Sequence, residues 1–128
     1  MTFKFSVKVF MDEIKIDERT FKFALLIIEL YKHLNSKHEY VLSKQLLRSG
    51  TSIGANVEEA QAAQSRKDFI SKMSIASKEA RESKYWIRLL ERSNYLSDFD
   101  KKEVLINEVN SIVNIITKIV KSTKENNI

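Results

Sequence analysis

The side chains that could catalyse a reaction or bind a metal are carboxylates and two histidines. Glu79 and Glu82 stand three residues apart, and Glu59 stands earlier in the chain. A di-iron helical bundle needs Glu-x-x-His motifs on two helices, but the nearest glutamate before His33 is Glu29, four residues away. The chain has no cysteine, which excludes thiolate zinc sites and cysteine nucleophiles.

The sequence supports hydrolytic chemistry no better than it supports a metal site. Helical-bundle ribonucleases of the nucleotide-binding-associated kind carry an arginine four to six residues before a histidine, and neither His33 nor His38 has one. We recognise no Ser-His-acid arrangement and no glycine-rich phosphate loop. We therefore interpret both histidines as surface residues and expect no enzymatic activity, no bound metal and no cofactor.

Positive charge is concentrated in one stretch of the chain. The net charge is +5, and residues 66–94 contain eight Lys or Arg against four Asp or Glu. A basic helical face with aromatic neighbours, here Tyr85 and Trp86, is a candidate surface for nucleic-acid phosphates. The alternative is a solvated face whose cations pair with nearby glutamates. The cations that share the face at helical spacing are Lys78, Arg81, Lys84, Arg88 and Arg92.

The only two glycines, Gly50 and Gly54, stand one turn apart in a stretch that otherwise predicts helix. Glycine costs a helix interior about 1 kcal/mol relative to alanine. Both fall on the same packing stripe as Ile53, where small side chains let another helix backbone approach closely. We predict tight helix packing at this stripe, within the bundle or between subunits.

Polar residues around the glycines are predicted to make packing or assembly contacts. If the second and third helices are antiparallel neighbours, Arg48 comes near the end of the third helix and Glu59 comes nearer its beginning. Hydrogen-bonded or ionic contacts of this kind specify register more than they stabilise. The residues concerned are Arg48, Asn56, Glu59, Glu79, Glu82 and, as an interior or interface anchor, Trp86.

Four amphipathic helices must position these groups. A 3.6-residue periodicity predicts them at about residues 17–36, 43–64, 66–94 and 99–124, with N-caps at Ser43, at Ser65, and at Asp98 or Asp100. The connections are short, so successive helices should run antiparallel. The prediction is an all-α fold, an antiparallel up-and-down four-helix bundle over residues 17–128. Residues 1–16 alternate apolar and polar side chains, and we expect a flexible segment there, with pairing to another chain as the alternative.

The stretch of residues 45–90 resembles the bacterial family of 23S rRNA intervening-sequence proteins, which are four-helix bundles. The chain departs from the family pattern in two places, because it lacks a proline near Gly54 and a glycine near Ala60. The features that carry the resemblance are Arg48, the pair Ser52-Ile53, Asn56-Val57 with Glu59, and the block Lys78-Glu79-Ala80-Arg81-Glu82 that leads to Tyr85-Trp86.

The resemblance implies partners rather than a reaction. Genes of this family occur inside intervening sequences of 23S rRNA genes, and no enzymatic activity is associated with the family. It is similar to the accessory protein of diversity-generating retroelements, a homopentamer that binds nucleic acid and works with a reverse transcriptase. The implied partners are therefore further copies of this chain, in a homopentamer, with RNA or DNA and a reverse transcriptase or another protein.

We therefore expect a non-enzymatic oligomeric protein, a nucleic-acid-associated accessory factor that uses the basic surface of its third helix. The alternative is an oligomeric protein-interaction scaffold without a nucleic-acid role, whose charge serves solubility. No apolar run reaches the ~18 residues of a membrane span, so we expect a cytoplasmic protein with no membrane partner.

Overall fold

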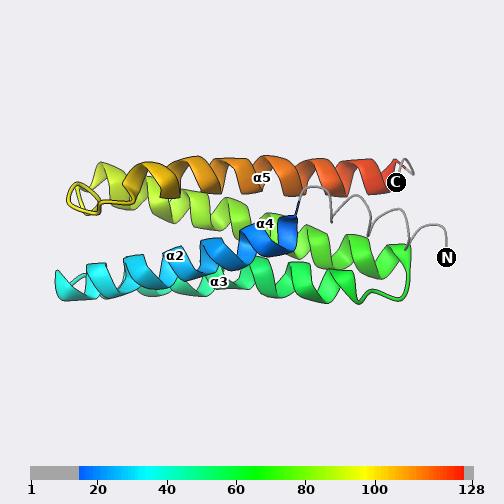
Figure 1. Ribbon diagram of the computed structural model, residues 1–128, viewed down its shortest axis with the longest axis horizontal. Coiled ribbons are helices and arrows are strands. Elements are labelled where there is room, and N and C mark those ends of the chain that lie inside the picture. The colour runs from blue at the N-terminus through cyan, green and yellow to red at the C-terminus, as the bar shows by residue number, and fades with distance from the viewer. Residues whose placement is uncertain (1–14, 126–128) are drawn as a thin grey trace.

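The computed structural model describes residues 15–125, which form four α-helices (Figure 1). They are α2 (Ile16–Ser36), α3 (Leu42–Gln61), α4 (Arg66–Arg92) and α5 (Lys102–Lys124). Each helix runs back along its predecessor, and α5 also packs against α2. The predicted all-α up-and-down bundle is confirmed. Ile16, which we assigned to the N-terminal segment, is instead a buried part of α2, and residues 1–14 lie outside the described part of the chain.

The apolar stripes of the four helices meet in one core. Each stripe repeats at three- and four-residue steps, so that one face of each amphipathic helix is removed from water. Helix α4, the longest, contributes four large apolar side chains together with small residues that admit its neighbours. The core members include Phe23, Ile27, Leu30 and Leu34 of α2, Leu46, Ile53 and Val57 of α3, Phe69, Met73, Ala76, Ala80, Ile87 and Leu90 of α4, and Leu105, Val109, Ile112, Ile116 and Ile119 of α5.

One of the predicted N-caps is confirmed and two are wrong. The Ser65 hydroxyl accepts a hydrogen bond from the Asp68 backbone N–H at 3.0 Å. Ser43, by contrast, lies within α3, and the carboxylate of buried Glu39 accepts the N–H groups of Val41, Leu42 and Ser43. The side chain of Glu39, which is longer than the predicted serine cap, thus accepts the free backbone N–H groups at the start of α3.

The fourth helix also starts differently from the prediction, because neither Asp98 nor Asp100 caps it. Helix α5 begins at Lys102, and its N-cap residue Lys101 makes no side-chain cap hydrogen bond. The Asp98 carboxylate contacts Lys37 at 2.7 Å and His33 at 3.1 Å instead. Asp98 therefore ties the connection before α5 to the end of α2. Helix α3 likewise ends at Gln61 rather than at residue 64, before Ala63 turns into the core.

The two glycines allow α3 to lie close against α2. A Cβ atom added to Gly50 would lie 2.8 Å from Ile27 Cγ1, and one added to Gly54 would lie 3.3 Å from the Thr20 carbonyl oxygen. The first distance is shorter than a carbon–carbon contact can be. Tight helix packing at Gly50 and Gly54 is thus found within the bundle, on the side of α2.

Candidate nucleic-acid interface

The predicted basic face lies on the outer side of α4 and turns toward α5. Arg81, Arg88 and Arg92 are exposed, and Lys84 is partly buried at the edge of the α4/α5 seam. Within residues 15–125, none of the five predicted cations forms an ion pair with an α4 glutamate, and Lys78 acts on Glu82 only as a nearby charge. Glu91 reaches Lys102 of α5 at 3.7 Å, and Glu82 is engaged by Arg48 of α3.

Three of the five predicted cations surround one hollow between α4 and α5. Lys84, Arg88 and Arg92 line it from α4, and its volume is about 250 Å³. Its apolar lining comes from Ile87 on α4 and from Ile106 and Val109 on α5, and Asn110 and Glu91 complete it. The hollow therefore combines an apolar lining with three positive charges.

A second hollow continues along the same seam toward the end of α5. It measures about 380 Å³ and is lined by Ser77 of α4 and by Thr117, Val120, Lys121, Lys124 and Glu125 of α5. Arg81 separates the two hollows, because its guanidinium donates to the Thr117 hydroxyl at 2.9 Å. We call the two hollows and the Arg81–Thr117 contact between them the α4/α5 furrow.

The α4/α5 furrow carries two lysines that the sequence did not reveal. Residues 95–128 have no net charge, because their acidic residues balance Lys121, Lys124 and the other lysines of that segment. Their position in the last turns of α5 is a signal, because the end of α5 must lie beside the first half of α4 in an up-and-down bundle. Lys78, a member of the predicted basic face, is exposed on α4 but lines neither hollow.

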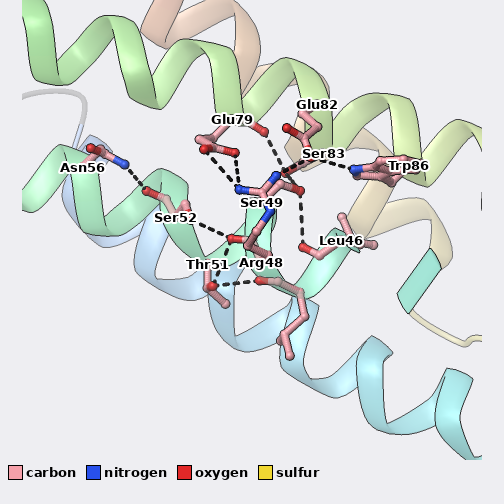
Figure 2. A network of polar contacts seen from close by, with 11 residues as sticks. Leu46, Arg48, Ser49, Thr51, Ser52, Asn56, Glu79, Glu82, Ser83 and Trp86 are labelled. Carbon is pink, nitrogen blue, oxygen red and sulfur yellow. Dashed lines mark hydrogen bonds and ion pairs between the residues drawn. The ribbon is translucent and has the colours of Figure 1, made fainter. Parts of the chain in front are cut away.

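On the other side of α4, a polar network joins it to α3 (Figure 2). The Arg48 guanidinium donates to both Glu79 carboxylate oxygens, at 3.2 and 3.3 Å, and to Oε2 of Glu82. The same Glu82 oxygen accepts the Trp86 indole N–H at 3.0 Å. Deeper in the seam, the hydroxyl oxygens of Ser49 and Ser83 lie 2.9 Å apart and are buried.

The network changes the ionisation of its members. Hydrogen bonds from Trp86 and Arg48, with the nearby charge of Lys78, lower the pKa of Glu82. The hydrogen bond to Glu82 raises the pKa of Arg48. Glu82 is thereby held as a charged acceptor, which suits it to fix helix register and not to exchange protons.

The remaining predicted packing residues make separate contacts. The Asn56 side-chain amide donates to the Ser52 carbonyl oxygen at 2.9 Å, one turn earlier in α3. Glu59 is exposed and pairs with Lys72 of α4 at 3.1 Å. Ile53 is fully buried. Asn56 is thus linked to Arg48 only through Ser52, whose hydroxyl donates to the Arg48 carbonyl oxygen at 2.6 Å (Figure 2). Glu59 makes its ion pair apart from Arg48.

Neither histidine lies in a metal-binding cluster. His33 meets Asp98 and packs its ring near Phe99, with ring centres 5.4 Å apart, and His38 contacts the Tyr40 hydroxyl at 2.9 Å. Within residues 15–125, no group of three or more His, Asp or Glu side chains is arranged to hold a metal ion. Among the helices in that same range, none has the length and apolar character to cross a membrane.

Comparison with known proteins places the chain in a family. Residues 12–118 match the family described as 23S rRNA-intervening sequence protein. A crystal structure of a protein of unknown function from the S23 ribosomal protein family of Bacteroides thetaiotaomicron VPI-5482 is 47% identical, with a TM-score of 0.77. The match covers 83% of this chain and 98% of that one. No curated protein matches the chain. On the extent of the family match and of this structural relative, the chain belongs to the 23S rRNA-intervening sequence protein family.

Proposed function

We propose that the protein is a non-enzymatic accessory factor that binds the phosphates of RNA or DNA along the α4/α5 furrow. The observation that carries the proposal is the convergence of cations from two helices on this one seam. Lys84, Arg88 and Arg92 surround the first hollow, Arg81 stands at its end, and Lys121 and Lys124 line the second.

The length of the furrow suits a polyanion better than a single small anion. Ser77 and Arg92 stand fifteen residues apart on α4, which corresponds to roughly 22 Å of helix. Duplex DNA presents one negative charge per ~1.7 Å of axis, so several phosphates fall within that length. Within residues 15–125, Lys84, Arg88 and Arg92 form no ion pair, which leaves their charge available to a ligand.

Binding is favoured over catalysis because the acidic side chains best suited to chemistry are already engaged. Glu79 and Glu82 accept hydrogen bonds from Arg48, and Glu82 also accepts one from Trp86. A general base must instead be free to take a proton from a substrate. The proposal therefore includes no reaction step.

Self-association is part of the proposal, and the family resemblance gives five as the expected number of copies. Several furrows on one particle would raise the effective concentration of binding sites for a long nucleic acid. A weak contact at each furrow would then add up to useful avidity. A reverse transcriptase or another protein, the further partner that the resemblance implies, would have to leave the furrows accessible.

The test is fluorescence anisotropy with labelled single-stranded RNA, single-stranded DNA and duplex DNA at several salt concentrations. We expect binding that weakens steeply with salt, because each neutralised phosphate releases counterions. The double variant Arg88→Glu/Lys121→Glu should lose binding to all three probes. Lys22→Glu/Lys101→Glu changes the net charge equally on lysines outside the furrow and serves as the matched control.

The alternative function, a protein-interaction scaffold, is favoured by a separate observation. Three large apolar side chains, Phe21, Leu25 and Ile28, are exposed on α2, away from the furrow. If the native protein shows no salt-dependent binding to any of the probes, the nucleic-acid role fails and the scaffold role becomes the better account. Equal losses in the furrow variant and its control would likewise reject the furrow as the binding site.

A further inference from the structure

Tyr85 stands in the middle of the basic face of α4, and its side chain is 52% exposed. Arg81 precedes it by four residues and Arg88 follows it by three. Lys78 and Arg92 lie seven residues away, one on each side. Residues at these steps share one face of a helix, so cations flank the ring at one turn and at two turns in both directions.

The Tyr85 ring lies beside the α4/α5 furrow and not inside it. Arg88 lines the first hollow and Arg81 ends it by donating to Thr117 of α5 at 2.9 Å, whereas Tyr85 lines neither hollow. Helix neighbours one turn apart have Cβ atoms only about 5–6 Å from each other. A nucleotide whose phosphate meets Arg81 or Arg88 can therefore place its base on the Tyr85 ring.

Trp86 supports the Tyr85 ring from the side of α3. The two rings meet edge to face, with centres 5.3 Å apart and planes inclined at 66°. The indole is itself fixed, because its N–H donates to Glu82 at 3.0 Å and Glu82 is engaged by Arg48 of α3 (Figure 2). The polar network between α3 and α4 thus positions Tyr85 in advance, which reduces the conformational entropy that a ligand has to remove.

The other exposed Phe, Tyr and Trp side chains among the described residues lie away from the basic face. Phe21 is on α2 and Tyr40 is in the connection before α3, with exposures of 61% and 56%. The neighbours of Phe21 one turn away include Asp17 and Leu25 but no cation. Tyr85 is therefore the exposed ring that stands among arginines.

This combination of groups matches the way in which proteins hold single strands. Such proteins pair a positively charged groove along the phosphate backbone with aromatic side chains on which bases stack. In a duplex the bases are paired and already stacked on one another, so a ring beside the phosphates finds no free base face.

We infer that Tyr85 stacks on an unpaired base, so that the preferred ligand of the α4/α5 furrow is single-stranded RNA or DNA and not a duplex. The inference rests on the proposed function, because the furrow supplies the phosphate contacts that bring a base to the ring. Every base has a π-face, so the preference is for single strands in general and not for one sequence.

The phosphate and base contacts can be separated by experiment. Arg88 and Lys121 meet groups that single strands and duplexes share, whereas Tyr85 meets a group that only a single strand offers. Removing the ring should therefore abolish the preference for single strands and leave the salt dependence of binding in place.

The test measures fluorescence anisotropy with labelled single-stranded RNA, single-stranded DNA, duplex DNA and an abasic DNA strand of the same length. The abasic strand keeps the phosphates and lacks the bases, so it isolates charge from stacking. We expect the native protein to bind single-stranded DNA about tenfold more tightly than the abasic strand. Tyr85→Ala should remove this difference and keep the affinity for the abasic strand within about twofold of the native value.

Two further variants serve as controls. Tyr85→Phe keeps the ring and should retain the preference for bases to within about twofold. Tyr40→Ala removes a tyrosine of similar exposure outside the basic face and should change no affinity. Sedimentation velocity measures the assembly of each variant. If Tyr85→Ala dissociates the assembly, Tyr85 belongs to a subunit contact and the inference is wrong.

Photochemical crosslinking locates the base directly. Iodouracil incorporated into the single strand should crosslink on irradiation to the aromatic ring on which it stacks, and mass spectrometry then identifies the residue. We expect the crosslink at Tyr85 in the native protein and its loss in Tyr85→Ala. A native protein that binds the strand without any crosslink at Tyr85 contradicts the inference.

The outcomes distinguish failure of this inference from failure of the proposed function. Salt-dependent binding of equal strength to single-stranded, duplex and abasic DNA would retain the furrow as a phosphate site and overturn stacking by Tyr85. An unchanged preference for bases in Tyr85→Ala would have the same meaning. Absence of binding to every probe would overturn both.

Discussion

Arg48 of α3 and Trp86 of α4 donate to the same oxygen atom, Oε2 of Glu82 (Figure 2). The Glu82 carboxylate therefore links the Arg48 guanidinium on α3 to the Trp86 ring, which lies on α4 with Glu82. A second carboxylate, Glu79, supports the same guanidinium. This shared acceptor fixes the register of α3 against α4, and the orientation of α4 determines where its basic face points.

The first prediction concerns Glu82→Ala. The substitution removes an ion pair and leaves the Trp86 N–H without its acceptor, so we expect the free energy of unfolding to fall by about 1 kcal/mol. Denaturant unfolding measures the change. Glu18→Ala, which removes an exposed pair within α2, is the comparison and should cost only a few tenths of a kcal/mol. Equal losses in the two variants would show that the shared acceptor has no special weight.

The second prediction concerns the pH dependence of stability at Asp98. Hydrogen bonds from Lys37 and His33 lower its pKa to about 2 from an ordinary 3.8. A carboxylate with a lowered pKa in the folded state stabilises above its unfolded pKa, and that contribution is lost as the pH falls from about 4 to about 2. Asp98→Asn should therefore unfold at a lower temperature than the native chain at pH 6, and the difference should vanish near pH 2. A pH-independent difference would contradict this account.

The third prediction is that Gly50→Ala destabilises the protein although alanine is the better helix former. The substitution gains about 1 kcal/mol of helix propensity. The new methyl group, however, would lie 2.8 Å from Ile27 Cγ1 and 3.0 Å from Cγ2, and both atoms are in the core. Overpacking of this kind costs about 1–3 kcal/mol, so thermal unfolding should occur at a lower temperature.

Gly54→Leu should lower the unfolding temperature further, because the new side chain would meet the Thr20 backbone. A Gly54→Leu protein of normal stability would show that close approach of the helices is not required at this position.

The fourth prediction concerns the cap of α3. Glu39 is buried, and its carboxylate accepts three backbone N–H groups. Glu39→Ala should lower the free energy of unfolding by about 2 kcal/mol, at the upper end of helix capping effects. Glu39→Gln keeps one acceptor oxygen and should lose less. If the alanine variant is as stable as the native chain, another group must satisfy these donors.

The sequence predicted the helices well because periodicity reports directly on burial. Leu46, Ile53 and Val57 stand on the predicted stripe of the second helix and are all buried. Caps were harder to predict, since they depend on where a side chain points. Ser43 has the right side chain for a cap but lies inside α3, and Asp98 is drawn to His33 and Lys37 by tertiary contacts.

The candidate site was predicted only in part, for a related reason. Spacing places Lys84, Arg88 and Arg92 on one face of a helix, but it does not say which neighbour that face meets. Lys121 and Lys124 join the furrow through the antiparallel packing of α5, and a charge count over their own segment conceals them.

The measurement that tests the central claim most directly is the salt dependence of RNA binding by the native chain, by Arg88→Gln and by Lys22→Gln. If Arg88 contacts a phosphate, its replacement should weaken binding to all sequences and reduce the slope of log Kd against log salt by about 1. Lys22→Gln, which changes the net charge equally on α2, should leave the slope unchanged. Identical slopes for all three proteins would contradict phosphate binding in the α4/α5 furrow.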